Sequence, residues 1–126
     1  MYTSGGALLP KTTVSGEPRY QVTRGQSVKA EFTYENLGKG TLNNVLVRYY
    51  ISTNSTISDT DTMIGSLNFT TFSRADVANT LKTLTIPNTL TVNTNYWLGA
   101  IINPLSTITE NDRSNNATYI SIRVVP

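Results

Sequence analysis

The sequence contains no cysteine and no histidine. Without cysteine, the chain has no disulfide framework and no thiolate metal site. The absence of histidine removes the commonest general base and the commonest metal ligand together. Nucleophilic triads in their usual forms are also excluded, because they depend on one of these residues. We therefore expect a protein that is not an enzyme.

Charge and long apolar runs are also scarce. The formal net charge is only +2, and the lysines and arginines are scattered along the chain. No basic run could follow a phosphate backbone, so we expect no nucleic-acid partner. No stretch reaches the length of a membrane span, so we expect no membrane insertion. Residues 1–10 lack both the basic region and the apolar core of a secretory signal.

The residues that are present favour an all-β domain. A chain of 126 residues is most simply one domain, and 38% of its residues are hydrophobic. The sequence is rich in threonine, which favours strands, and in asparagine and serine, which favour turns. We expect residues 1–10 to be a flexible leader and residues 11–126 to form the domain.

Two segments with period-two alternation, Tyr96–Ile102 and Ala117–Val125, indicate an antiparallel hairpin around which the domain is organised. Ser27–Glu35 alternates even more clearly, and a slip of one residue would bury its hydrophilic side chains. In these three segments the side chains expected to face inward are Tyr96, Leu98, Ala100, Ile102, Ile120, Ile122, Val124, Val28, Ala30, Phe32 and Tyr34.

The remaining strands are less regular. We expect them at Val45–Ser52, Thr62–Phe69 and Asn79–Ile86, with a broken first strand made of Lys11–Val14 and Tyr20–Thr23. If Arg48 faces water, Val45, Val47, Tyr49 and Ile51 face inward. Leu81 is out of phase with Leu84 and Ile86, which a bulge or a misplaced boundary would explain. About seven antiparallel strands in two sheets, with no helical periodicity, indicate an immunoglobulin-like β-sandwich.

Three motifs resemble one family. They are Tyr34-Glu35-Asn36-Leu37-Gly38, then Tyr49-Tyr50-Ile51-Ser52 with Ile57-Ser58-Asp59-Thr60-Asp61, and Tyr96-Trp97-Leu98-Gly99-Ala100 with Glu110–Asn116. Together they resemble CARDB, the cell-adhesion-related domain found in bacteria and archaea, over roughly residues 20–125. Asn103 stands where the family often has Asp, and Arg113 where it often has Glu.

The resemblance implies a non-catalytic extracellular or cell-surface module, cut from a larger surface or secreted protein, that serves as a spacer or in adhesion. Its partners would be neighbouring domains of the parent protein, with a polysaccharide or another surface protein as alternatives. Two alternatives remain open for its function. One is a carbohydrate-binding module, and the other is a self-assembling filament subunit in which residues 1–10 reach into the next copy.

The candidate binding residues lie on the outward side of the Tyr96 sheet. The strand phases place Trp97 and Ile101 outward on the central strand, with Tyr50 and Leu46 on one neighbour and Tyr119 on the other. The two arginines flanking this strip are Arg48 and Arg123. A flat aromatic strip can stack on sugar rings or form a protein interface. Alternatively, a loop such as Thr71–Ala78 or an adjacent domain covers Trp97.

Two oxygen-rich loops are candidates for calcium, although we expect no resident metal or other cofactor. One contains Glu110 and Asp112, and the other contains Asp59 and Asp61. In the alternative interpretation, the side chains of these loops bond to their own backbone. The two loops are expected at opposite poles of the sandwich, where they could not share an ion. Either carboxylate pair would also be too well solvated for acid–base catalysis.

Overall fold

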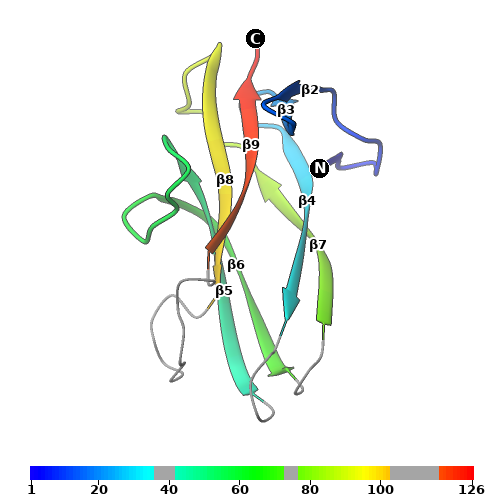
Figure 1. Ribbon diagram of the computed structural model, residues 1–126, viewed down its shortest axis with the longest axis vertical. Helices are drawn as coiled ribbons and strands as arrows, with labels where there is room; N and C mark the ends of the chain where they lie inside the picture. The colour runs from blue at the N-terminus through cyan, green and yellow to red at the C-terminus, as the bar shows by residue number, and fades with distance from the viewer. Residues whose placement is uncertain (36–41, 73–76, 103–116) are drawn as a thin grey trace.

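The structure is a computed structural model that describes residues 1–35, 42–72, 77–102 and 117–126 (Figure 1). Within these ranges it contains nine strands and no helix, so no helix there could cross a membrane. The strands are β1 Tyr2–Thr3, β2 Lys11–Val14, β3 Glu17–Val22, β4 Ser27–Glu35, β5 Leu42–Ser52, β6 Thr62–Phe72, β7 Val77–Thr85, β8 Thr94–Ile102 and β9 Ala117–Val124.

The strands form two sheets, which confirms the predicted immunoglobulin-like sandwich. One sheet has the order β1-β4-β7 and the other has the order β2-β3-β9-β8-β5-β6. In Figure 1, β4 and β7 form one layer beside the layer of the longer sheet. The prediction of antiparallel strands needs one correction, because β3 pairs with β9 in parallel. On its other side β3 pairs with β2 in an antiparallel hairpin.

The core consists of the side chains that period-two alternation placed inward. Those now seen to be buried are Val28, Ala30, Phe32, Val45, Val47, Tyr49, Ile51, Tyr96, Leu98, Ala100, Ile122 and Val124. The rings of Phe32 on β4 and Tyr49 on β5 have centroids 5.6 Å apart, so they join the two sheets. The side chain of Tyr34 lies outside the described residues.

The N-terminal segment is packed against the domain. Residues 1–10 were expected to be a flexible leader, but Met1 and Leu9 are buried in the core. Tyr2 and Thr3 pair with Lys29 and Val28 of β4. Burial of two apolar side chains is a sufficient physical reason for the segment to fold back.

The expected broken first strand is instead a hairpin. Lys11–Val14 pairs along its whole length with the first residues of β3. The turn between them is made by Ser15 and Gly16, which have φ values of 53° and 81°. Two successive positive φ angles are the signature of a tight hairpin turn. The sequence could not show this pairing, because neither strand has a clear apolar face.

Leu81 does not lie at a bulge. The register between β4 and β7 is continuous from Ser27 to Glu35, and Leu81 is 57% exposed on the outer side. Lys82 takes the inward position opposite the buried Ala30. An inward charge on an edge strand discourages pairing with another chain, which gives Lys82 a physical role. The bulge in this domain lies between Tyr49 and Tyr50, where β5 pairs with β6.

Candidate binding face on the six-stranded sheet

The outer side of β5, β8 and β9 contains the predicted binding residues, and we call it the Trp97 face. β8 lies between β5 and β9, as the phases indicated. The register aligns Tyr50, Gly99 and Tyr119 in one row across the three strands. The next row aligns Ser52, Trp97 and Ser121. Arg48 is aligned with Ile101 on the other side of the Gly99 row.

These residues differ widely in accessibility. Tyr119 is 39% exposed, whereas Trp97, Arg48 and Arg123 are half-buried. Tyr50 is only 2% exposed, so the expectation that its ring forms part of an open strip is wrong. The accessible aromatic part of the face therefore consists of Trp97 and Tyr119.

The burial of Tyr50 has its explanation in Ile57, from the loop 53–61 between β5 and β6. Ile57 is itself buried, and it packs directly over Gly99. A Cβ atom at Gly99 would overlap Cγ1 of Ile57 and lie 2.7 Å from its Cγ2. The missing side chain of Gly99 thus leaves a notch beside Tyr50, and Ile57 fills it. The sequence suggested Thr71–Ala78 as a loop that covers Trp97. Residues 73–76 of that segment lie outside the described residues.

The polar side chains of the loop 53–61 bond to the loop itself. Asn54 Oδ1 accepts a hydrogen bond from Thr56 N at 2.9 Å, and Asp61 Oδ2 accepts one from Ser58 N at 2.8 Å. These are the local turn bonds that Asx residues commonly form. Across the described ranges, no group of three Asp, Glu, His or Cys side chains could hold a metal ion. Glu110 and Asp112 lie outside the described residues.

Two arginines lie beside Trp97, and one of them was not identified from the sequence. Arg123 Nη1 donates a hydrogen bond of 2.9 Å to Oδ1 of its cross-strand partner Asn95. Arg19 was missed because it reaches this face only through the parallel pairing of β3 with β9, which sets it opposite Ser121. Its Nε atom is buried and has no hydrogen-bond partner among the described residues. No local pattern signals such a placement.

No model of a known protein family matches the sequence, and no curated protein matches it either. Solved structures do match. The crystal structure of the CARDB domain of the PF1109 protein from Pyrococcus furiosus, in complex with di-metal ions, superposes with a TM-score of 0.63. The sequences are 18% identical, and the match covers 83% of this chain and 79% of that chain. The solution NMR structure of the same domain gives a TM-score of 0.62, again at 18% identity, with 83% and 85% covered.

The two sheets and these matches define the class of this protein as an immunoglobulin-like β-sandwich domain. Within that class, its fold is similar to that of the CARDB domain. The resemblance found in the sequence motifs is thereby supported by the arrangement of the strands in space.

Proposed function

We propose that this chain is a non-catalytic adhesion module of a larger cell-surface or secreted protein, and that the Trp97 face is its contact surface. The observation that carries the proposal is the accessible pair of Trp97 and Tyr119 on a regular sheet, flanked by arginines. Aromatic and arginine side chains are enriched where proteins make contacts. The hydrogen bond from Arg123 to Asn95 fixes one guanidinium before any ligand arrives.

The filament alternative is less well supported by the packing of residues 1–10. Met1 and Leu9 fill positions in the core of their own domain. For this segment to reach into another copy, the domain would have to expose those positions. We therefore do not propose an exchange of the N-terminal segment.

A polysaccharide is the ligand that best fits the Trp97 face, because a flat ring on a sheet can stack on a sugar. Isothermal titration against a panel of polysaccharides should detect binding. Trp97→Ala should weaken any such binding about tenfold or more, since tryptophans that a ligand covers contribute a large share of the binding free energy. Leu81→Ala, an exposed apolar truncation on the other sheet, should leave the affinity unchanged. Equal affinity of the wild type and Trp97→Ala would contradict the proposal.

We also propose that Asp59 and Asp61 hold no resident metal. The Pyrococcus neighbour was crystallised with di-metal ions, but Asp61 of this chain already accepts a hydrogen bond from its own loop. Added millimolar calcium should therefore leave the melting temperature unchanged, because only a ligand that binds the folded state raises it. The measurement is thermal unfolding with and without calcium. A rise that disappears in Asp59→Asn would show that a metal does bind here.

A further inference from the structure

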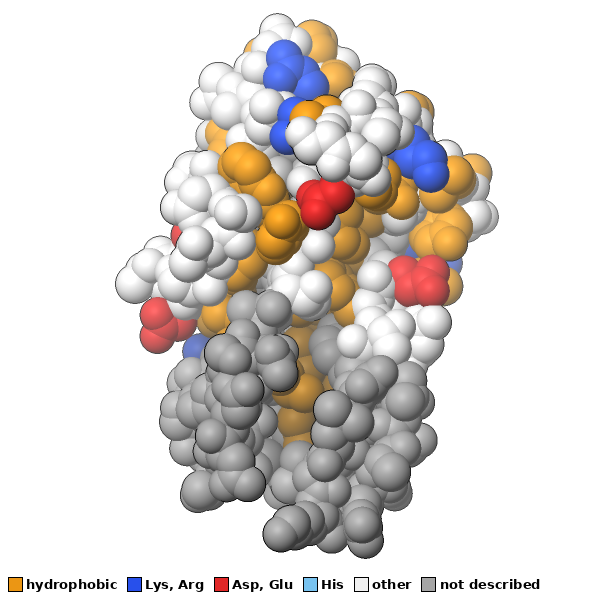
Figure 2. All heavy atoms as spheres, viewed as in Figure 1, with side chains coloured by type: hydrophobic (Ala, Val, Ile, Leu, Met, Phe, Trp, Pro, Cys, Tyr) orange, Lys and Arg blue, Asp and Glu red, His pale blue; other side chains and the backbone are white. Residues whose placement is uncertain are grey.

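A cleft of about 670 Å³ opens along the side of the sandwich where β4 faces β9. We call it the lateral cleft. Its lining includes Glu17 and Tyr20 of β3, Glu31 and Thr33 of β4, and Tyr119 and Ile120 of β9. Figure 2 shows hydrophobic side chains exposed in a furrow on this side of the molecule. The cleft is thus a partly apolar furrow between the two sheets.

One side of the cleft is an incompletely paired sheet edge. β1 pairs with β4 only at Val28 and Lys29, near the beginning of that strand. Among the described residues, no strand lies beside Glu31 and Thr33 on the same edge. An exposed strand edge is a template for the backbone of another chain. β4 therefore offers such a template along the cleft.

The opposite side of the cleft, formed by β9, is also an incompletely paired sheet edge. β3 pairs with β9 only over Ser121–Val124. Within the described part of the chain, Thr118 and Tyr119 have no strand beside them on that edge. The edge of β7, by comparison, has the inward charge of Lys82 to discourage pairing. The inward positions of β4 along the cleft are instead the apolar Ala30 and Phe32, so an added strand could approach that edge.

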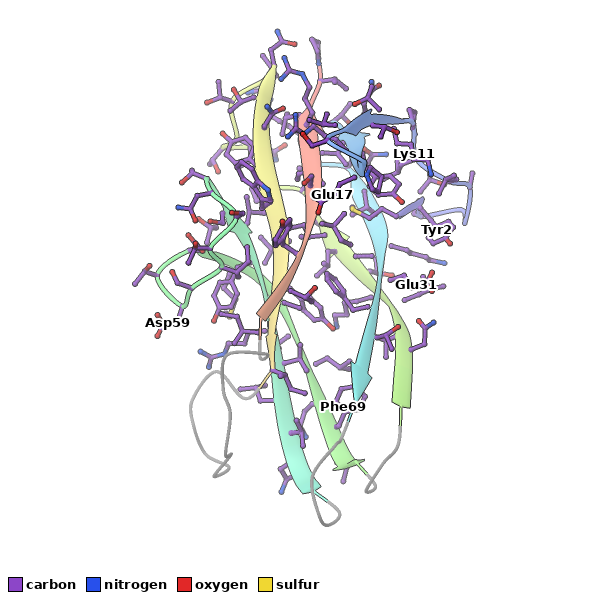
Figure 3. All side chains as sticks on the ribbon, viewed as in Figure 1. Tyr2, Lys11, Glu17, Glu31, Asp59 and Phe69 are labelled. Atoms are coloured by element: carbon purple, nitrogen blue, oxygen red, sulfur yellow. The ribbon has the colours of Figure 1, made fainter. Side chains whose placement is uncertain are left out.

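The cleft is acidic. Its lining contains Glu17 and Glu31 but no lysine or arginine side chain, and Figure 3 shows Glu17 near β9 and Glu31 beside β4. Glu31 accepts hydrogen bonds from Tyr2 Oη at 3.2 Å and from Asn79 Nδ2 at 3.0 Å. Both donors are uncharged, so they do not neutralise it. Its negative charge, together with the hydrogen bond, raises the pKa of Tyr2.

The amino group of Met1 is the cation nearest to this carboxylate in the lining. Burial lowers the pKa of that amine, while the charge of Glu31 acts in the opposite direction. Lys11 is not in the lining, but its Nζ lies 5.9 Å from the ring centroid of Tyr20, so the acidic part of the cleft is the stretch of β4 at Glu31.

We propose that the lateral cleft accepts an extended, basic segment of a partner polypeptide, which adds as a strand along the edge of β4 at Glu31 and Thr33. Alternate side chains of an added strand point to opposite sides. Apolar side chains of the segment would face Tyr20 and Ile120, and its lysines or arginines would face Glu31. The added strand would lie along β4, away from Trp97, although Tyr119 borders both this cleft and the Trp97 face.

The test uses a synthetic peptide of about nine residues, an ordinary strand length, in which valine and lysine alternate and both ends are blocked. It is titrated into the isotopically labelled full chain and followed by amide chemical shifts. We expect saturable binding with shifts at Glu31 and Thr33. A matched peptide with glutamate in place of lysine should bind far more weakly. A peptide with proline at alternate positions should not bind, because proline cannot donate to a ladder.

Two charge variants distinguish peptide binding in the cleft from a general electrostatic attraction to the protein. Glu31→Gln should weaken the valine–lysine peptide about threefold, a typical effect for an exposed charge pair. Asp59→Asn removes the same charge from the loop on the other side of the molecule and should have no effect (Figure 3). Trp97→Ala should also leave peptide binding intact. Absence of saturable binding, equal binding of the glutamate peptide, equal effects of the two charge variants, or shifts confined to the Trp97 face would overturn the proposal.

Discussion

Leu98→Ala should lower the free energy of unfolding by about 2–5 kcal/mol, the usual cost of truncating a fully buried leucine. Leu98 is completely buried on β8, the strand between β5 and β9, and its register partners are Ile51 and Ile120. Removal of its branched end leaves a cavity at the centre of the longer sheet. Neighbouring strands cannot close that cavity without breaking their pairing with β8.

Urea unfolding followed by far-ultraviolet circular dichroism measures this loss. The matched control is Leu81→Ala, the same chemical change at a position that is 57% exposed. It should change the free energy of unfolding by less than about 0.5 kcal/mol. If the two variants were equally stable, the burial of Leu98 in the core would be wrong.

Gly99→Ala should cost about 1–3 kcal/mol, the range expected for overpacking. The new methyl group would overlap Cγ1 and Cδ1 of Ile57. Because Cγ1 is only one bond from the Cβ atom of Ile57, rotation of its side chain end cannot relieve the overlap. The loop 53–61 would therefore have to move away from the sheet. Because Trp97 is two residues from Gly99 on the same face, its fluorescence should change as well.

Two further variants test this explanation. Gly5→Ala is the control, since a Cβ there meets nothing closer than 3.8 Å and its φ is not positive. It should leave stability nearly unchanged. In the double variant Gly99→Ala with Ile57→Ala, the overlap is removed, so the two effects should couple by about 0.5–3 kcal/mol. Strict additivity would mean that Ile57 does not occupy the notch.

The strand positions could be predicted closely where one face is apolar and the other is polar. Ser27–Glu35 was placed at its observed bounds, because alternation there allows only one register. The prediction was poorer for Lys11–Val14, which is exposed along its length. A strand with no buried face has no period for the sequence to reveal.

The candidate site was only partly predictable. The outward phase of Trp97, Tyr50 and Tyr119 follows from period two, and the register confirms it. Outward phase does not determine exposure, as Tyr50 shows. Its burial depends on Ile57, which lies on a different element and reaches it through a glycine on a third strand.

The sequence by itself determined which side chains of its alternating strands face the core, because alternation is a property of each strand alone. It also determined the sandwich class, through the number and spacing of such strands. Only the tertiary structure decided that Arg19 lies on the Trp97 face, that Tyr50 is covered and that Glu31 borders a cleft. Each of these depends on contacts between residues far apart in the chain, which no local pattern encodes.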